Sequence, residues 1–499
     1  MLKNKIKFLF LSLTLSFLSC SDYLSEQPDN RTLIDSKEKI SSLLIGAYPA
    51  GNYQLMAELM SDNVSEKITT GGDVIDLEMY QWLDTNLDTR DTPIAYWNSC
   101  YKAISQANQA LASSNELLAS NPEAILNGSL DLRPQMAEAL IARAYAHFML
   151  VNFWAKPYDP ATASSDLGIP YVLEPETNLI KEYKRNSIEE VYNLIENDLL
   201  LGLVSLENSY QEPKFHFTKD AANAFATRFF LYKGDWAKAI EHANKVISNP
   251  SSEIRDMIAN SNLTYSQNQR NYASALEATN LLVGSTSSLW ARKFARSRFG
   301  LSNSKANELF FGGSGNPFGK GWAYGVFGND QVFNLPKYEE YFKITNQSAG
   351  IGQPFLGIVL LDKDEVLLNR AEAYAMMGNY ASSLNDLNTF LSKKTSGHDP
   401  LTDILTEDIL TTIYPVIANE YTPFYTLTDK QSSFIKGIAE YRRREYYHEG
   451  LRWFDVKRYQ LEVTHIFDGS PIVLAKKDNR KELQIPQTAQ NFGVSPNPR

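Results

Sequence analysis

The sequence contains only two cysteines and six histidines among its 499 residues, and it has fewer basic than acidic side chains. The histidines form no His-Glu-x-x-His pattern and no pair at helical spacing, so a zinc site lacks its usual ligands. Lys and Arg number 48 against 58 Asp and Glu, which leaves a formal net charge of −10. A surface that neutralises phosphates must be basic, so this balance excludes a general nucleic-acid binder.

Motifs that would carry catalysis are also missing. The glycine-rich segment 312–328 lacks the Ser or Thr that completes a phosphate-binding loop, and it fails the spacing of a nucleophile elbow. The acidic run 362–365 opens a predicted helix, where carboxylates meet the positive end of the helix dipole. We favour that structural role over a pair of glycosidase carboxylates. No enzyme activity, cofactor or metal is therefore expected.

The first 19 residues have the order of a secretory signal. Lys3, Lys5 and Lys7 precede an apolar run over 8–18, which is shorter than the roughly 20 residues that span a bilayer. Residues 17–20 (FLSC) resemble the lipobox of a bacterial lipoprotein, in which the thiol of Cys20 takes a lipid. An ordinary signal peptide with an accidental cysteine is the alternative.

Lipidation of Cys20 has two consequences for the mature chain. Cys100 is left unpaired, so no disulfide framework holds the fold together. Loss of the three signal lysines takes the net charge from −10 to −13, so lipid chains rather than a basic patch must hold the protein to a membrane. Residues 20–36 then form the acylated start and a polar tether.

Helical periodicity dominates the rest of the chain, and convincing alternating strands are scarce. With 43% hydrophobic and 21% charged residues, the chain can bury a sizeable core. The sequence predicts an all-α protein with long inserted loops, built as a single domain over 37–499 with halves of about 37–260 and 261–499. The clearest predicted helices are 94–118, 136–154, 187–206, 221–232, 236–247, 365–377, 380–391 and 434–458.

An internal repeat appears when residues 221–247 are aligned with 365–391. Each unit is a helix, a glycine turn (Gly234 or Gly378), an aromatic residue, a small residue and a second helix. This order is typical of tetratricopeptide (TPR) repeats. Such hairpins bury their apolar faces only by stacking on neighbours, and the long interval between the two units predicts insertions, where specific function is expected.

Four features together resemble the RagB/SusD-like outer-membrane lipoproteins. They are the start of the mature chain at 20–24, the helix and loop over 137–171, the helical pair around Gly378, and the segment 442–458 (RRREYYHEGLRWFDVKR). The last is the most specific and is similar to the family signature RxxEL-x-x-EG-x-RWFDLRR. Departures include Tyr446 in place of Leu and a C-terminus without the family's usual acidic residue and NPGY-like end.

The resemblance implies a TPR-like scaffold exposed on the cell surface and anchored in the outer membrane by lipid. It further implies a partner, a TonB-dependent transporter of the SusC type, to which the protein delivers a nutrient. That nutrient is commonly an oligosaccharide and in some members a peptide. The resemblance implies no catalytic activity. Alternatives from other classes are an enzyme acting on polysaccharide and a TPR scaffold that joins proteins.

A carbohydrate site needs exposed aromatic rings beside short polar side chains. Trp97, Trp154, Trp236 and Trp453 fall within helical patterns and are expected in the core. Other candidates fall in or beside predicted loops and are expected to contact ligand: Trp82, Asn86, Arg90, Trp290, Trp322 and Tyr324. The alternative is that each ring plugs its own loop onto the scaffold.

The charged signature 442–458 is expected to be structural. On one continuous helix, Glu445 and Glu449 would lie on the same face, and Glu449 would pair with Arg452. Trp453 and Phe454 would contribute to burial. A contact with the transporter is the second interpretation of this segment.

Overall fold

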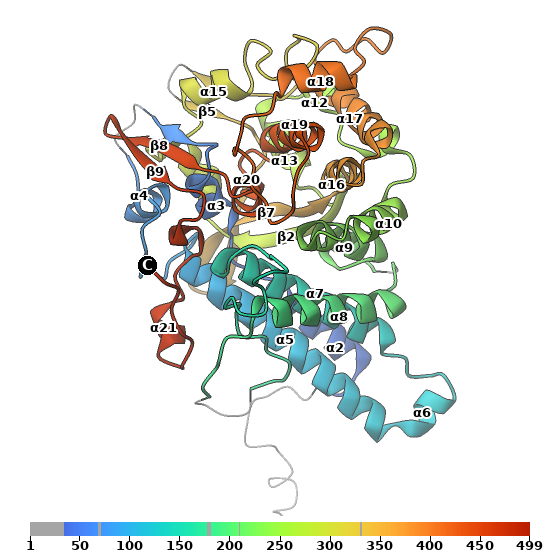
Figure 1. The fold of residues 1–499 in the computed structure, drawn as a ribbon. Helices are drawn as coiled ribbons and strands as arrows, with labels where there is room; N and C mark the ends of the chain where they lie inside the picture. Colours follow the sequence, from blue (N-terminus) through green and yellow to red (C-terminus); the bar gives the residue numbers. More distant parts are fainter. Residues whose placement is uncertain (1–33, 68–70, 177–180, 209, 330–331) are drawn as a thin grey trace, which may run out of the picture.

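A computed structural model describes residues 34–67, 71–176, 181–208, 210–329 and 332–499. The signal peptide, the lipidation site Cys20 and most of the tether lie outside the described residues. Helices outweigh strands throughout, and the predicted all-α, TPR-like fold is confirmed (Figure 1). Within the ranges given above, no helix has both the length and the apolar character that a membrane crossing demands.

The helices of the first half are α2 (Lys37–Leu44), α3 (Gln54–Met60), α4 (Val74–Tyr80), α5 (Pro93–Ser120), α6 (Pro122–Leu126), α7 (Arg133–Trp154), α8 (Ile188–Ser205), α9 (Lys219–Lys233), α10 (Trp236–Val246), α11 (Pro250–Glu253) and α12 (Met257–Asn260). Those of the second half are α13 (Tyr265–Tyr272), α14 (Trp290–Arg296), α15 (Asn303–Leu309), α16 (Lys363–Met376), α17 (Tyr380–Lys394), α18 (Glu407–Ile413), α19 (Asp429–Glu445), α20 (Leu451–Arg458) and α21 (Gln487–Gln490).

Three long helices, α5, α7 and α8, pack side by side in the N-terminal half (Figure 1). The hydroxyl of Thr92 caps α5 by accepting from the Ala95 amide, and the capping box predicted at Ser187 and Glu190 opens α8. Helix α7 is buried along almost all of its length from residue 137 to 154. Because almost no part of α7 faces solvent over this stretch, α7 forms the centre of this half.

The predicted repeat is present as two helical hairpins, α9 with α10 and α16 with α17. Gly234 and Gly378 follow the first helix of each hairpin with φ values of 81° and 75°, a conformation that only glycine adopts without strain. Asp235 and Asn379 then cap the second helices through their side chains. Because α10 packs against α16, the two hairpins stack on each other although 144 residues separate corresponding positions of the sequence.

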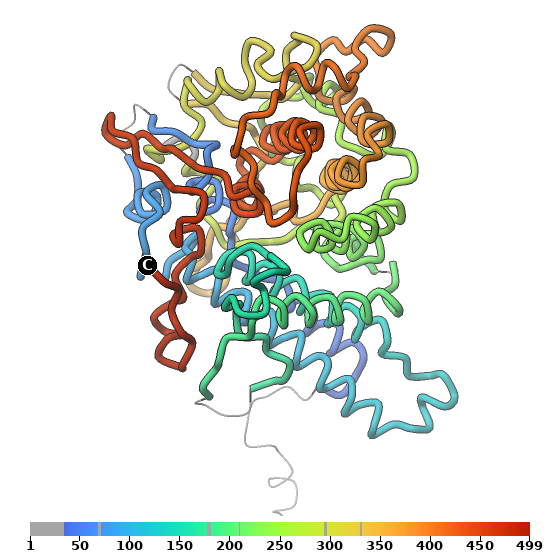
Figure 2. The backbone as a smooth tube through the Cα atoms, in the orientation of Figure 1, coloured from blue at the N-terminus to red at the C-terminus, as the bar shows by residue number. Residues whose placement is uncertain are grey.

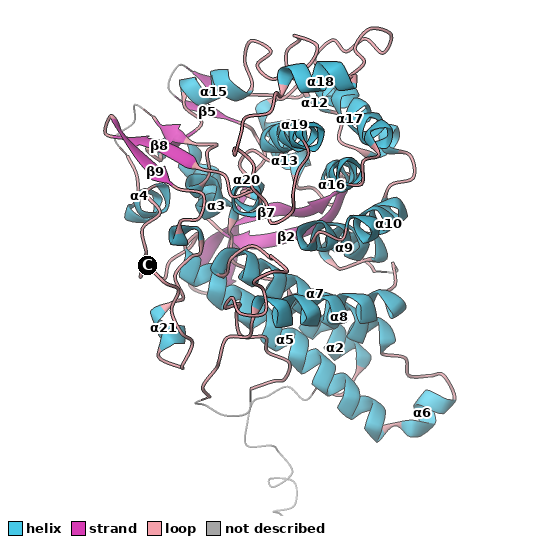
Figure 3. Cartoon of the chain, viewed as in Figure 1, coloured by secondary structure: helices cyan, strands magenta, loops and turns pink. Residues whose placement is uncertain are grey.

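Strands are the main feature that the sequence did not reveal. They are β1 (Ser65–Glu66), β2 (Asn280–Ser287), β3 (Phe299–Gly300), β4 (Phe327–Asn329), β5 (Val332–Asn334), β6 (Glu340–Asn346), β7 (Ile351–Asp362), β8 (Val463–Phe467) and β9 (Ser470–Leu474). The largest sheet is antiparallel in the order β2-β7-β6, and α9 contacts both β2 and β7 (Figure 3). Most of β2 is buried on both faces, so its sequence does not alternate.

The helix predicted over 434–458 is in fact two helices, which corrects that expectation. Helix α19 ends at Glu445, a turn follows, and α20 begins after Gly450. His448 and Gly450 have φ values of 75° and 74°, which end any α-helix. The turn also brings the C-terminal segments beside the N-terminal ones, and α20 contacts α3 (Figure 2).

Candidate functional site

The four aromatic rings predicted to contact ligand are buried. Exposed fractions are 3% for Trp82, 2% for Trp290, 6% for Trp322 and 7% for Tyr324. The expected exposure is therefore absent in this structure, and none of these rings offers a free face to a sugar. Each instead fixes its segment to the scaffold, as the alternative interpretation held.

Each buried ring has a partner for its polar atom, which explains why burial is tolerated. The Trp82 Nε1 donates to the Met60 carbonyl at 2.9 Å, and the ring stacks on His465 at 4.5 Å between centroids. The other three donate as follows: Trp290 Nε1 to the His448 carbonyl at 3.0 Å, Trp322 Nε1 to the Ser314 carbonyl at 2.8 Å, and the Tyr324 hydroxyl to Glu445 Oε2 at 2.8 Å.

The two polar candidates lie on the surface. Asn86 is exposed, whereas Arg90 is partly buried and its Nε donates to Ser287 Oγ at 2.9 Å. The six predicted residues thus do not converge on one cavity. Ligand contact by Asn86 and Arg90 stays a prediction.

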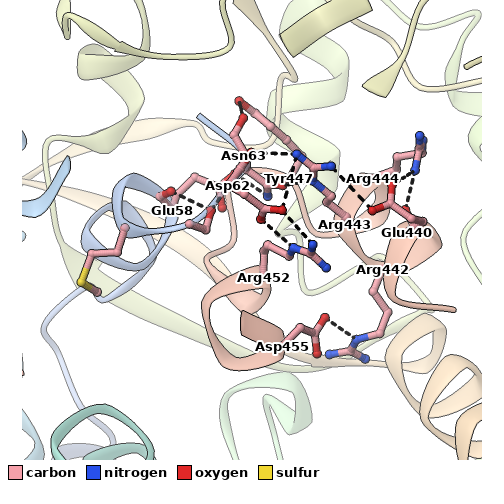
Figure 4. A network of polar contacts seen from close by, with 12 residues as sticks. Glu58, Asp62, Asn63, Glu440, Arg442, Arg443, Arg444, Tyr447, Arg452 and Asp455 are labelled. Carbon is pink, nitrogen blue, oxygen red and sulfur yellow. Dashed lines mark hydrogen bonds and ion pairs between the residues drawn. The ribbon is translucent and has the colours of Figure 1, made fainter. Parts of the chain in front are cut away.

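The C-terminal signature forms a buried polar network (Figure 4). Arg452 makes a bidentate ion pair with Asp62, with Nε and Nη2 donating at 2.7 and 2.8 Å. Arg443 Nε donates to Asn63 Oδ1 at 2.8 Å, and Arg444 Nη1 donates to Glu440 Oε2 at 2.8 Å. Burial would raise the pKa of Asp62, but the adjacent guanidinium groups of Arg443 and Arg452 outweigh it and lower that pKa.

These contacts correct the ion pairs expected from one continuous helix. Glu449 lies in the turn and pairs with Lys337 at 2.6 Å, not with Arg452. Glu445, at the end of α19, pairs with Lys394 at 3.0 Å. Trp453 and Phe454 are buried as predicted. The signature joins N- and C-terminal segments, and Arg442, Arg443, Arg444 and Arg452 are only 1–6% exposed, which supports the structural role expected for it.

A cavity of about 490 Å³ lies between α5 and the C-terminal segment, and we call it the α5 cavity. One wall is a stripe along α5 made of Trp97, Tyr101, Ser105 and Gln109, which recur every four residues and so share one helix face. The facing walls come from the α7–α8 connection and the segment around α21. Their lining residues are Pro170, Val172, Glu174, Pro175, Glu176, Lys181, Tyr183, Thr488, Ala489, Phe492 and Val494.

Hydrogen bonds tie the walls of the α5 cavity to one another. The Tyr101 hydroxyl donates to the Pro170 carbonyl at 2.9 Å, and the Tyr183 amide donates to the Phe492 carbonyl at 2.9 Å. The rings of Trp97 and Tyr101 lie 4.9 Å apart. The cavity is therefore held open by fixed contacts, so a ligand would lose little affinity to ordering the walls.

The lining of the α5 cavity combines aromatic surface with short polar side chains. Phe492 is 43% exposed, and the Tyr183 hydroxyl has no hydrogen-bond partner among the described residues. Ser105 and Thr488 add hydroxyl groups, and Gln109 adds an amide. A volume of this size with a few convergent polar groups is typical of small-molecule sites.

Charged side chains at the α5 cavity are not paired with one another. Glu174, Glu176 and Lys181 form no ion pair with any described residue, and Lys181 Nζ lies 5.1 Å from the centre of the Tyr183 ring. Across the described part of the chain, no group of three or more His, Cys, Asp or Glu side chains is arranged to hold a metal ion.

Part of the α5 cavity was visible in the sequence. The helical pattern predicts Trp97 in the core, and the residue is only 5% exposed, yet it also lines the cavity. The spacing of Trp97, Tyr101, Ser105 and Gln109 could have marked a stripe of mixed aromatic and polar character. The facing wall lies almost 400 residues later, and no local pattern indicates that Phe492 returns to α5.

Two family models match the chain. One, described as "Starch-binding associating with outer membrane", matches residues 22–231, and one described as "SusD family" matches residues 364–497. Together they cover well over half of the sequence. Among curated proteins, none matches this chain.

Solved structures share the fold across nearly the whole chain. A SusD superfamily protein from Bacteroides thetaiotaomicron is 18% identical with a TM-score of 0.60, covering 93% of this chain and 100% of its own. A SusD superfamily protein from Bacteroides fragilis is 18% identical with a TM-score of 0.62, covering 92% and 99%. A SusD-like carbohydrate binding protein from Bacteroides vulgatus is 15% identical with a TM-score of 0.58, covering 92% and 96%.

Proposed function

Because the chain belongs to the SusD/RagB-like family, we propose that it is a carbohydrate-binding lipoprotein of the outer-membrane surface. In this proposal it captures an oligosaccharide or polysaccharide and passes it to a SusC-like TonB-dependent transporter. Lipid on Cys20 holds it at the surface. The protein binds the glycan without altering it, since its task is capture and delivery.

The α5 cavity is the observation that carries this proposal. A sugar ring presents apolar C–H faces and a rim of hydroxyl groups. The rings of Tyr183 and Phe492 offer apolar surface to those faces, and Ser105 and Gln109 offer hydrogen bonds to the rim. Capture there would raise the local glycan concentration beside the transporter.

Retention and cleavage of glycans separate the proposed function from its rivals. The purified protein would be tested against a panel of polysaccharides for both retention and release of reducing ends. Retention without release supports a binder, whereas release indicates an enzyme. If the panel is not retained but peptides are, the protein captures peptides.

Variants locate the binding site. Phe492→Ala should weaken retention because it removes an aromatic wall of the α5 cavity that is already partly exposed, so the melting temperature should change little. Phe215→Ala is the matched control, since Phe215 is 41% exposed and does not line the cavity. Equal retention by both variants would contradict a site in the α5 cavity. Asn86→Ala and Arg90→Ala, assayed alongside, test the predicted surface contacts.

A further inference from the structure

We propose that the protein has a second carbohydrate site, for neutral sugars, where the turns of the two helical hairpins meet. A hollow of about 460 Å³ lies there, and we call it the hairpin-turn hollow. Four separate segments contribute its walls, and none of its lining residues belongs to the α5 cavity. The lining residues are Tyr158, Pro160, Lys233, Gly234, Asp235, Trp236, Ala237, Met377 and Phe424.

The hollow arises from the repeat itself. Trp236 is the aromatic residue that follows the glycine turn in the first hairpin, and Tyr380 is its counterpart in the second. The Tyr380 ring packs on Phe434 at 4.9 Å between centroids. Trp236 is partly buried, as Tyr380 is, and packs on Tyr425, and it also lines the hollow. The aromatic position of the first hairpin thus serves packing and also borders the hollow, whereas Tyr380 is not among the residues that line it.

Aromatic rings meet at fixed angles in the hairpin-turn hollow. The ring of Phe424 stands edge-on to Tyr158, with centroids 6.2 Å apart and planes at 82°. Tyr425 supports Trp236 from the side, at 5.2 Å and 89°. A Cβ on residue 234 would lie 2.8 Å from Phe424 Cζ, so glycine lets that ring sit against the turn. These rings are held by neighbours and lose little freedom when a ligand stacks on them.

The charges around the hollow compensate one another, which selects a neutral ligand. Lys233 Nζ pairs with Glu196 Oε2 at 2.5 Å, and Lys238 Nζ pairs with Glu196 Oε1 at 2.8 Å and with Asp235 Oδ2 at 3.3 Å. Two cations and two carboxylates leave no net charge for an ionic ligand to complement. An anionic or cationic ligand would have to compete with these ion pairs.

A polar group is available beside the rings. The Tyr158 hydroxyl forms no hydrogen bond with a described residue, although its ring lies 4.7 Å from that of Tyr192. Apolar ring faces, one available hydroxyl and balanced charge match the C–H faces and hydroxyl rim of a neutral pyranose. Exposed Met377 adds a flexible apolar edge, 56% accessible, that can adapt to the sugar.

Hydrogen exchange tests this site independently of the α5 cavity. The mature protein would be mixed with maltohexaose, cellohexaose or xylohexaose, and amide protection would be measured by mass spectrometry. At least one oligosaccharide should protect 230–240 and 421–427. Segments 97–109 and 488–494 report the α5 cavity, so failure at one site is distinguishable from failure at the other.

Two conservative variants complete the test. Phe424→Leu keeps apolar volume but removes the flat ring, and it should weaken binding at the hollow about tenfold while binding at the α5 cavity is unchanged. Tyr158→Phe should weaken binding at the hairpin-turn hollow by a smaller factor, because only a hydroxyl group is lost. Phe215→Leu should have no effect.

Three results would overturn the second site. The first is that none of the three oligosaccharides protects 230–240. The second is that affinity at that segment is unchanged in Phe424→Leu. The third is protection by a proline-rich peptide but by no oligosaccharide, which would assign the hollow to a protein partner.

Discussion

Trp82 shows how a single side chain joins distant parts of this protein. It follows α4 with a φ of 55°. Its Nε1 donates a hydrogen bond to the Met60 carbonyl, and its ring stacks on the ring of His465. The positive φ is unusual for a bulky residue and is maintained only because the surrounding contacts compensate for it. The ring is thus part of the packing between N- and C-terminal segments.

Replacing this ring should cost stability. Trp82→Ala should lower the free energy of unfolding by about 3–5 kcal/mol, the range for removing a large buried aromatic side chain. Urea denaturation measures the change. Asn86→Ala, four residues away on the exposed loop, should change it by less than about 0.5 kcal/mol. A stable Trp82→Ala protein with lost glycan retention would instead make this ring a ligand contact.

Glu58 is a buried carboxyl group in the polar network around the C-terminal signature, and it forms no ion pair with the described residues. Its oxygens accept from the amides of His448 and Gly450 at 3.1 and 3.2 Å and from Asn63 Nδ2 at 3.0 Å. Burial raises the pKa of Glu58 from 4.5 to about 7, and these hydrogen bonds only partly oppose the rise. The folded protein therefore holds the Glu58 proton more tightly than the unfolded chain does.

The raised pKa predicts how stability depends on pH. Between pH 4.5 and about 7 the folded state binds more protons than the unfolded state at this site, so its contribution to stability falls as pH rises. Glu58→Gln removes that titration. The unfolding free energy of the variant minus that of the wild type should therefore rise by about 3 kcal/mol from pH 5 to pH 8. A constant difference across that range would show that Glu58 titrates normally.

At the scale of elements, the turn between α19 and α20 decides where the C-terminal signature points. Gly450 has a φ of 74°, and a Cβ there would lie 2.7 Å from Ala57 Cβ and 3.0 Å from the Gln54 carbonyl. The glycine therefore meets two requirements at once: a left-handed backbone and close contact with α3.

Gly378 separates these two requirements, because its φ is 75° but a Cβ there would meet nothing within 4 Å. Gly378→Ala should lose about 1–2 kcal/mol, the cost of the left-handed conformation. Gly450→Ala should lose a further 1–3 kcal/mol or so from overpacking against α3. Thermal melting compares the two variants. If both variants lose the same amount of stability, the close contact between Gly450 and α3 contributes nothing, which would contradict the overpacking argument.

Helices were predictable from the sequence where one face is apolar and the ends carry caps, as at Ser187 for α8 and Gly234 after α9. The α19–α20 break was missed because apolar spacing continues through it, although Gly450 was a signal. Strand β2 was missed because burial on both faces removes alternation. Only part of the α5 cavity could be predicted from the sequence. The stripe along α5 follows from local spacing, whereas Phe492 reaches the cavity through tertiary packing.

At the scale of the whole molecule, two stacked hairpins and the α5, α7 and α8 group support cavities on different segments. The α5 cavity and the hairpin-turn hollow share no lining residue. Whether 37–499 folds as one unit with halves that meet near residue 260 stays a prediction. The lipid anchor also stays a prediction, since Cys20 precedes the described residues.

The anchor has a direct test in intact cells. Cys20→Ala should abolish palmitate labelling and release the protein from the membrane fraction, because the net negative charge of the mature chain disfavours electrostatic attachment to an anionic membrane. Cys100→Ala is the matched control, since Cys100 is buried and carries a free thiol. Continued labelling of Cys20→Ala would refute lipidation at this position.

The ion pair of Asp62 with Arg452 also constrains how the protein is made. The two residues are 390 positions apart, and Arg443 reaches Asn63 across 380. Until segment 443–458 is in place, Asp62 and Asn63, which follow α3, lack their guanidinium partners, and α3 lacks the cover of α20. In a chain shortened before α20, the early segments keep apolar surface uncovered, so such a chain should need chaperones and attract proteases.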